Sequence, residues 1–372
     1  MKPTRVGLLF GGRSVEHEVS LSSARGVARA MGETALVCVP IGVTPEGRWL
    51  SPEVSRAILD GDGARVEPPA GGDDGDRIVL DPGRRGMQRV TADRTARPLA
   101  VDVVFPLVHG WGGEDGRLQG ALDLAGLPCV GAGVLGSAVG MDKAVAKSLL
   151  ERHGVPVTPW ILATRARFAR APAAVVDQVL AALRPPLFVK PANGGSSVGI
   201  TKVERPGGLA DALEFAFAHD RRVLVERGID AREIECAVLG NDEPEASGLG
   251  EIVPSREFYD YEAKYLDDAS RLIIPAELDG AQGERLRRQA VEAYRALDLA
   301  GFARVDFLVE RNGDRYFLNE VNTLPGFTPI SMFPKLWDAA GLPFPRLIER
   351  LVSLALERAT DESTRRTART TG

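Results

Sequence analysis

The sequence predicts an α/β protein, with an open and largely parallel sheet at the N-terminus followed by two further units in which strands and helices alternate. The first observation is a strand–helix–strand order, in which apolar runs at residues 5–10 and 35–41 flank a helix that begins near Val15. The second is a pair of strand-like runs on either side of a glycine–serine loop at 194–197. The third is a pair of β-rich runs near the C-terminus that carry regularly spaced polar residues.

The chain divides into three predicted units and a tail. Residues 1–131 form an N-terminal α/β domain, 132–226 a central unit and 227–359 a C-terminal unit. Residues 60–97 are rich in Gly, Asp, Arg and Pro and have weak periodicity, so we expect a mobile insertion inside the first domain. Residues 360–372 are polar and rich in Thr and Arg, and we expect them to form a disordered tail.

Helix signals within these units are clear at three places. Residues 137–153 read as one helix that ends at Gly154. A second helix is expected over 283–297, and a last one over 344–358.

Length and composition exclude several classes of function. The chain has 372 residues and a net charge of −5, which gives no electrostatic reason to expect nucleic acid as a partner. Cys38, Cys129 and Cys236 are too far apart for zinc spacing and are expected to be buried thiols. Since no signal-peptide core and no membrane-length apolar run is found, we expect a cytoplasmic protein without a membrane partner.

The two β-rich runs near the C-terminus hold oxygen-bearing side chains at period two. Asp306 interrupts an apolar run, with Arg304 on the same face of the predicted strand. Glu320 and Asn322 share a face of the following strand, and a turn rich in Asn, Gly and Asp predicts a hairpin between the two. Carboxylate and amide oxygens suit Mg²⁺, so the pattern predicts a metal site at Asp306, Glu320 and Asn322. The alternative is a polar sheet face with an ion pair between Arg304 and Asp306.

The loop at 194–197 is the second chemical signal. Lys190 ends an apolar strand, and the loop reads Gly-Gly-Ser-Ser before the next strand begins. Backbone N–H groups of such a loop can surround phosphate oxygens, and the hydroxyls add donors. No G-x-x-x-x-G-K-[ST] motif is present, so this is not a Walker loop. Alone it is equally compatible with a flexible hairpin; beside a magnesium site it predicts a lid over a triphosphate.

Several long segments, in the same order along nearly the whole chain, resemble D-alanine–D-alanine ligases of the ATP-grasp superfamily. They are GGRSVEHEVS at 11–20, HGWGGEDG at 109–116, MDK at 141–143, YDYEAKY at 259–265 and EVNTLPGFTPISM at 320–332. The resemblance implies a two-lobed ATP-grasp fold after the N-terminal domain. It also implies ATP-dependent joining of two D-alanine molecules through a D-alanyl phosphate, with release of ADP and phosphate, for peptidoglycan precursor synthesis. It further implies magnesium or manganese, typically two ions, and a homodimer.

The resemblance also implies roles for individual residues. For ATP it implies phosphate contacts from Lys143, Lys190, Lys264, Ser196 and Ser197, and contacts to adenine and ribose from Glu226 and Glu233. For D-alanine it implies that Glu16 receives the first ammonium group, with Ser196 and Tyr265 linking this carboxylate to a mobile loop, and with His109 nearby. Arg304 and the backbone at Gly326 would stabilise the oxyanion, and Ser331 with Met332 would contact the second D-alanine.

Three alternatives differ in class or in product. A D-alanine–D-lactate ligase would share the fold, but in that family phenylalanine accompanies ester formation at the position of Tyr265, where tyrosine accompanies the dipeptide. A non-catalytic nucleotide or amino-acid binding protein would not need the metal ligands together with Arg304. A Rossmann oxidoreductase is disfavoured because residues 7–14 contain no G-x-G-x-x-G run.

Overall fold

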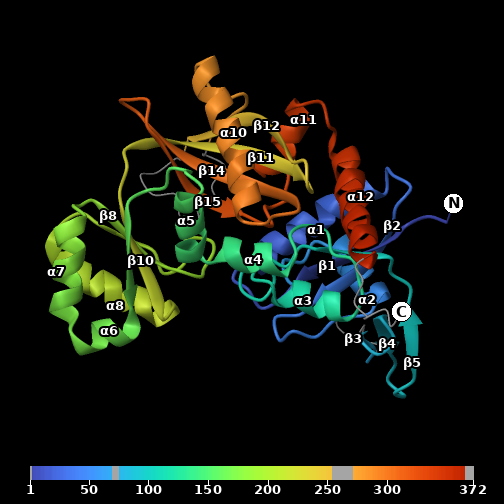
Figure 1. Cartoon of the computed structure of the whole chain (residues 1–372). Helices are drawn as coiled ribbons and strands as arrows, with labels where there is room; N and C mark the ends of the chain where they lie inside the picture. The colour runs from blue at the N-terminus through green and yellow to red at the C-terminus, as the bar shows by residue number, and fades with distance from the viewer. Residues whose placement is uncertain (1, 69–74, 254–270, 365–372) are drawn as a thin grey trace, which may run out of the picture.

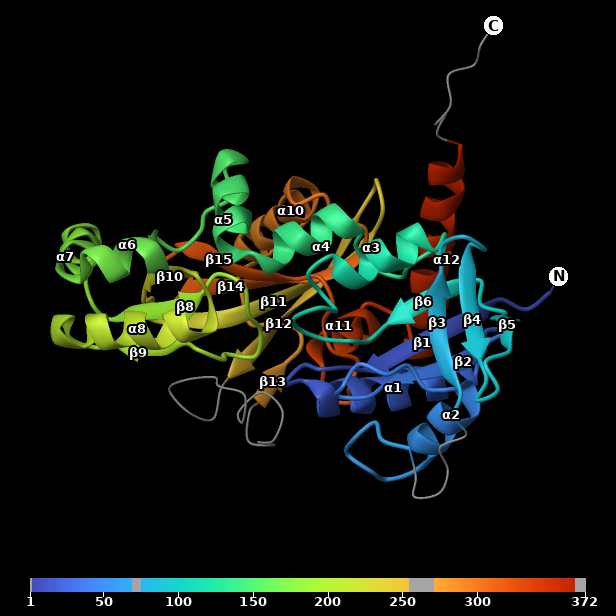
Figure 2. The same ribbon diagram turned by 90° about the horizontal axis from the view of Figure 1, so that it is seen from below.

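The computed structural model describes residues 2–68, 75–253 and 271–364. Within these ranges four β-sheets organise the chain, and helices cover them. In Figures 1 and 2 the N-terminal sheet lies beside the C-terminal helix at one end of the molecule, and a small lobe with helices α6 to α8 lies at the other. A five-stranded sheet lies between them, and this arrangement brings three parts of the chain to one centre.

The N-terminal sheet is parallel, as predicted. Its strands run in the order β2-β1-β6, and both neighbouring pairs are parallel. The elements are β1 (Arg5–Gly11), α1 (His17–Met31), β2 (Val37–Val43), α2 (Pro52–Asp60), β6 (Val103–Pro106) and α3 (Arg117–Leu124). The loop after β1 therefore lies at the carboxyl edge of the sheet, where open α/β sheets bind ligands.

The segment expected to be a mobile insertion contains a small sheet of its own. Strands β3 (Arg77–Asp81), β4 (Gly86–Val90) and β5 (Ala96–Leu99) pair antiparallel in the order of the chain. Ile78 and Met87 are buried in the apolar cluster that backs the N-terminal sheet. Part of the insertion expected at 60–97 therefore has regular structure, because a few apolar residues along short strands are enough to anchor a segment that is otherwise polar.

The central unit contains an antiparallel sheet of order β7-β10-β8-β9. Its elements are β7 (Trp160–Thr164), α6 (Arg165–Arg170), α7 (Pro172–Ala182), β8 (Leu187–Pro191), β9 (Thr201–Val203), a 3-10 turn (Pro206–Gly208), α8 (Leu209–His219) and β10 (Arg222–Arg227). The glycine–serine loop connects β8 and β9 and so lies at one end of this sheet.

The single helix predicted over 137–153 is wrong, because the structure has two. Helix α4 (Val134–Met141) ends at Asp142, and α5 (Lys143–Arg152) begins directly after it. Asp142 has an extended backbone, and its side chain accepts hydrogen bonds from the N–H groups of Ala144 and Val145, which makes it the N-cap of α5. The break places Lys143 in the first turn of a new helix.

Helix α5 packs only in part on the unit to which it was assigned. Its residues Ala146 and Leu150 share an apolar core with residues of the C-terminal sheet such as Val305 and Leu318. A backbone hydrogen bond from Leu318 N to Pro156 O connects the same regions. Ala144, in the first turn of α5, packs instead against Leu224 of the central sheet. Helix α5 therefore bridges the central unit, to which the prediction assigned it, and the C-terminal sheet.

The C-terminal sheet has the order β13-β12-β11-β14-β15, and all its neighbouring pairs are antiparallel. The elements are β11 (Ala231–Gly240), β12 (Glu245–Val253), β13 (Arg271–Ile273), α10 (Gly280–Ala296), β14 (Gly301–Glu310), β15 (Tyr316–Asn322), α11 (Met332–Ala339) and α12 (Phe344–Ser363). The β14–β15 pair is the predicted hairpin, with Asp306 opposite Glu320 and Arg304 opposite Asn322.

An aromatic core joins the two ends of the chain. The rings of Phe105, Phe302 and Phe327 meet edge to face, with centroids 5.6–6.4 Å apart. Helix α12 packs against α1, beside which it lies in Figure 1. In addition, Phe327 N donates a hydrogen bond to Ser23 Oγ at 3.1 Å. These contacts hold the chain after β15 against the N-terminal domain.

The last helix is longer than predicted. It continues past Thr360 to Ser363, because its polar residues lie on an exposed face and Thr360 Oγ1 donates to Leu356 O within the helix. The expected disordered tail is therefore wrong for residues 360–363, and residues 365–372 lie outside the described part. No described helix is both long and apolar enough to cross a membrane.

The cysteines agree in part with the expectation. Cys129 and Cys236 are buried free thiols, and burial raises the pKa of each to about 12, whereas Cys38 is only half-buried.

Candidate active site

A cavity of about 740 Å³ lies where the N-terminal domain, the glycine–serine loop and the C-terminal sheet meet. Every predicted site residue that the structure describes lines it: Glu16, His109, Lys143, Lys190, Ser196, Ser197, Glu226, Glu233, Arg304, Asp306, Glu320, Asn322, Gly326, Ser331 and Met332. Lys264 and Tyr265 lie outside the described residues. The cavity thus collects side chains that are up to 316 positions apart in the sequence, from Glu16 to Met332.

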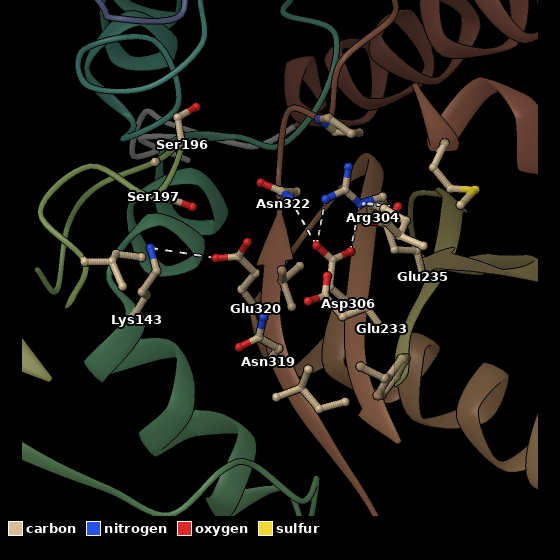
Figure 3. A pocket seen from close by; sticks show the side chains of 18 of the residues that line it. Lys143, Ser196, Ser197, Glu233, Glu235, Arg304, Asp306, Asn319, Glu320 and Asn322 are labelled. Carbon is tan, nitrogen blue, oxygen red and sulfur yellow. Dashed lines mark hydrogen bonds and ion pairs between the residues drawn. The ribbon is translucent and has the colours of Figure 1, made fainter. Parts of the chain in front are cut away.

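The β14–β15 hairpin forms one wall of this cavity. Figure 3 shows Asp306, Glu320 and Asn322 on one face of the hairpin, with Lys143 across from Glu320. Asn322 Nδ2 is 3.4 Å from Asp306 Oδ2, and Lys143 Nζ is 3.9 Å from Glu320 Oε2. The three side chains offer hard oxygen atoms toward one space, a donor set that fits Mg²⁺. Among the described residues no group of three or more His, Cys, Asp or Glu is arranged to hold a metal ion.

Arg304 has two carboxylate partners in this wall. Its Nε and Nη2 atoms donate to both oxygens of Asp306, each at 2.7 Å, and its Nε is 3.0 Å from Glu235 Oε2. Burial lowers the pKa of Arg304, but the charges of Asp306 and Glu235 outweigh burial and hold it well above its ordinary value. The ion pair named as the alternative is therefore present, yet carboxylate oxygens keep further lone pairs for a cation. In the described part of the chain the Nη1 atom has no partner, which leaves it available to a ligand.

A second side of the cavity is formed by α5 and the glycine–serine loop. Lys143 Nζ donates to Gly194 O at 2.6 Å and so connects the helix to the loop. Ser196 and Ser197 have positive φ angles of 48° and 60°, a backbone region that favours glycine and is rare for serine. The loop is held in this shape partly by Asn193, whose N and Nδ2 atoms donate to Asp220 and Asp142.

Below the loop lies a buried cluster of charge. Lys190 Nζ is 2.9 Å from Glu226 Oε2, Lys147 Nζ is 3.3 Å from Glu226 Oε1, and Thr158 Oγ1 donates to Glu226 Oε2 at 2.9 Å. Burial raises the pKa of Glu226, but the charges of Lys147 and Lys190 outweigh it and hold that pKa below its usual range. The resemblance implied that Glu226 contacts the nucleoside; in the structure its carboxylate forms ion pairs with Lys147 and Lys190.

The N-terminal domain contributes Glu16 and His109. Ser196 Oγ donates a short hydrogen bond to Glu16 Oε1, which connects the glycine–serine loop to the start of α1. His109 Nδ1 lies 3.2 Å from Leu324 O and 3.8 Å from Glu114 Oε1. Burial lowers the pKa of His109, but Glu114 and Glu16 outweigh it and the net pKa is raised. Within the described residues His109 Nε2 is buried without a hydrogen-bond partner, so it can serve a ligand.

The turn after β15 supplies the remaining predicted residues. A Cβ atom added at Gly326 would lie 2.8 Å from Ser331 Oγ, so a larger residue here would force the Ser331 side chain to move. Ser331 Oγ in turn accepts a hydrogen bond from Thr328 N at 3.0 Å. Met332 begins α11 and is only 3% exposed, so most of its surface packs in the core even though it reaches the cavity wall.

Sequence reasoning missed Lys147, Thr158 and Glu235. Lys147 follows Lys143 by four residues, which puts both on one face of α5, and this spacing was the available signal. Glu235 had the same kind of signal, because it alternates with Glu233 along β11 and pairs with Asp306 in the sheet register. Thr158 lies outside regular structure, and nothing in its local sequence marks it.

Comparison with known proteins decides the family. Models described as "D-ala D-ala ligase N-terminus" and "D-ala D-ala ligase C-terminus" match residues 5–132 and 149–353. A curated D-alanine–D-alanine ligase A from Chromobacterium violaceum is 50% identical over 362 residues, a match that covers 96% of each chain. The chain belongs to the D-alanine–D-alanine ligase family.

Solved structures of this family share the fold. A D-alanine–D-alanine ligase from Coxiella burnetii has a TM-score of 0.83 and 35% identity, covering 98% of this chain and 97% of its own. A D-Ala:D-Ser ligase from Enterococcus faecalis has a TM-score of 0.80 and 36% identity, covering 95% and 99%. The predicted membership of the D-alanine–D-alanine ligases and the predicted ATP-grasp fold are confirmed, and the chain is a ligase of the ADP-forming kind.

Proposed function

We propose that this ligase joins two D-alanine molecules to D-alanyl-D-alanine at the expense of ATP, as the names of its curated relatives indicate. The observation that carries the proposal is the single cavity that contains the oxygen-bearing hairpin, the lysines and Glu16 together. A non-catalytic binding protein has no need for this combination. The D-alanine–D-lactate alternative is not favoured, because relatives 45–50% identical to the chain are named as dipeptide ligases.

Asp306, Glu320 and Asn322 would hold Mg²⁺, in keeping with a family that depends on ATP and typically uses this ion. When bound, the ion neutralises charge that develops on the phosphoryl oxygens. The donor set supports the assignment, since Mg²⁺ takes few protein oxygens and completes its shell with phosphate and water.

Lys143 and Lys190 would orient the triphosphate from the opposite side. Lys143 lies between the loop carbonyl of Gly194 and Glu320, and Lys190 lies in the Glu226 cluster. A carboxylate is a poor electrophile, so the carboxylate of the first D-alanine attacks the γ-phosphate and displaces ADP to give an acyl phosphate. The ammonium group of this D-alanine would pair with Glu16, which Ser196 holds in place.

The second half of the reaction needs donors for an oxyanion. The free amine of the second D-alanine attacks the acyl carbon, and the tetrahedral intermediate then releases inorganic phosphate. Arg304, through its Nη1 atom, and the backbone N–H at Gly326 would stabilise the oxyanion, which is worth roughly 3 kcal/mol for one such donor. Ser331 would contact the second carboxylate.

The test is a product assay with competing nucleophiles. The enzyme is mixed with ATP, Mg²⁺ and D-alanine, together with equal D-lactate and D-serine, and the products are identified by mass at neutral pH. D-Alanyl-D-alanine should dominate, phosphate release should require D-alanine, and L-alanine should not replace it. Ester as the main product would contradict the proposal and the interpretation of Tyr265, and D-alanyl-D-serine would reassign the second site.

Other expectations stay predictions with direct checks. The cytoplasmic location can be tested by cell fractionation, and the homodimer by light scattering of the purified protein. The roles of Lys264 and Tyr265 rest on the resemblance and can be tested by Lys264→Met and Tyr265→Phe.

A further inference from the structure

Lys147 is a buried cation next to the proposed nucleotide site that no step of the reaction uses. It lies on α5 with 2% of its surface exposed and is not among the residues that line the cavity. Its Nζ atom donates to Thr158 Oγ1 at 2.7 Å and is 3.3 Å from Glu226 Oε1. Burying an ammonium group costs folding free energy, and Lys147 shares its carboxylate partner with a second lysine, so its position needs an explanation.

The charges of the cluster do not balance. Lys147 and Lys190 share one carboxylate, so with both lysines protonated the cluster carries one positive charge in excess. The two oxygens of Glu226 are also unequal. Oε2 serves Lys190 and Thr158, whereas Oε1 accepts no hydrogen bond in the described part of the chain and has Lys147 as its ion-pair partner.

We infer that Lys147 is a positioning residue. Its ammonium group partly neutralises the Glu226 carboxylate, so that the Lys190 ammonium keeps a net positive charge for nucleotide phosphates. Lys190 reaches the cavity and Lys147 lies behind it, so Lys147 acts through Glu226 and not by touching the ligand. The inference rests on the proposed function, because it takes the cavity to bind ATP.

The physical reason is a competition for Lys190. If Lys147 is removed, Glu226 and Lys190 become a neutral pair in a buried place, where attraction between opposite charges is strong. Glu226, which Lys190 already contacts at 2.9 Å, then pairs with Lys190 alone, and the excess positive charge that fits an anionic ligand is lost. Nucleotides should bind less tightly in proportion to their phosphate charge, and adenosine should be unaffected.

The pKa of Lys147 agrees with this arrangement. Burial lowers the pKa to about 8, although Glu226 and Glu320 raise it and Lys190 lowers it further. Lys147 therefore carries its positive charge at neutral pH and loses it as the pH rises through about 8.

The experiment measures nucleotide binding in the full-length protein by calorimetry. In Lys147→Met the Kd for ATP and ADP should rise about tenfold, and that for adenosine should change less than twofold. Arg152→Met, which removes an exposed cation from the same helix, is the matched control and should leave all three unchanged. Equal loss of ATP and adenosine binding, or no loss of ATP binding, would overturn the inference.

A double-mutant cycle tests the route through Glu226. In a Glu226→Gln background there is no carboxylate to capture Lys190, so Lys147→Met should change the Kd for ATP by less than threefold. An equal loss in both backgrounds would contradict the proposed route.

Two further controls separate the possible failures. Lys147→Gln removes the charge but can still hydrogen-bond Thr158. It replaces Lys147→Met if that variant does not fold, and the Kd for ATP should then rise by the same factor of about ten. Failure of both variants to fold would overturn the inference, because Lys147 would then serve stability. If the parent enzyme releases no phosphate from ATP with D-alanine, the proposed function fails; if it does and Lys147→Met binds ATP normally, only this inference fails.

Discussion

Two walls of the same cavity differ in charge and in burial. On the β14–β15 wall, Asp306, Glu320 and the adjacent Glu235 outnumber Arg304, so carboxylate is in excess and the side chains of the hairpin are partly exposed. On the other wall, Lys190 on β8 and Lys147 behind it on α5 outnumber Glu226 on β10, and the whole cluster is buried.

Under the proposed function, this difference would allow a protein with net charge −5 to bind a triphosphate and a divalent cation side by side. In the proposed function the acidic wall would attract the cation and the basic wall would attract the phosphates. Low dielectric behind the basic wall strengthens the attraction there. The following changes test whether the two walls act as described.

The largest effect is expected on the acidic wall. Glu320→Gln keeps the shape of the side chain but removes one of the charges that would hold the metal ion, and kcat for phosphate release with D-alanine should fall by roughly 100-fold or more. Glu310→Gln is the control on the same hairpin, since Glu310 pairs with the exposed Arg315 away from the cavity. Comparable losses in the two variants would mean that the hairpin matters for folding and not for catalysis.

The next effect concerns Arg304. Lysine keeps the positive charge but cannot bind both oxygens of Asp306 and still present a further N–H to an oxyanion. Arg304→Lys should therefore lower kcat roughly tenfold to 100-fold with a smaller change in the KM for ATP. Both constants are measured by steady-state phosphate release. A rise in KM with unchanged kcat would show that Arg304 does not stabilise the transition state.

A smaller effect is expected from pH on the basic wall. Lys147 has a pKa lowered to about 8, so it loses its proton as pH rises through that value, and the cluster loses its excess positive charge. The Kd for ATP should rise roughly fivefold between pH 7 and pH 9 in the parent enzyme and stay nearly constant in Lys147→Met. Parallel pH curves for the two proteins would show that another group titrates.

The smallest effect is expected from Asp142, which caps the start of α5, the helix that carries Lys143 and Lys147. Asp142→Ala removes the N-cap acceptor and the ion pair with Arg222, and the free energy of unfolding should fall by about 1–2 kcal/mol in urea titrations. The KM for ATP should rise only a few-fold, since α5 keeps its packing. Asp142→Asn retains the cap and should lose less than half as much; an equal loss would assign the effect to Arg222.

The acidic wall could be predicted from the sequence because hairpin register follows from period-two spacing. Asp306 and Glu320 stand out among apolar neighbours, and a turn of four or five residues brings them opposite each other. Residues 77–99 and the break at Asp142 could not be predicted in the same way. Their structure depends on a few buried apolar contacts and on one capping side chain, which local periodicity does not reveal.

The fold class, the family and the hairpin could be identified from the sequence alone, because they depend on local patterns and on long motifs. The same motifs identified the predicted site residues, and those that the structure describes all line the cavity. Only the tertiary structure decided that Lys147 lies behind Lys190 and that Glu226 divides its charge between them. The same holds for the third carboxylate, Glu235, beside Arg304. Charge balance in a buried cluster depends on which side chains meet across elements far apart in the chain, and spacing along one element does not contain that information.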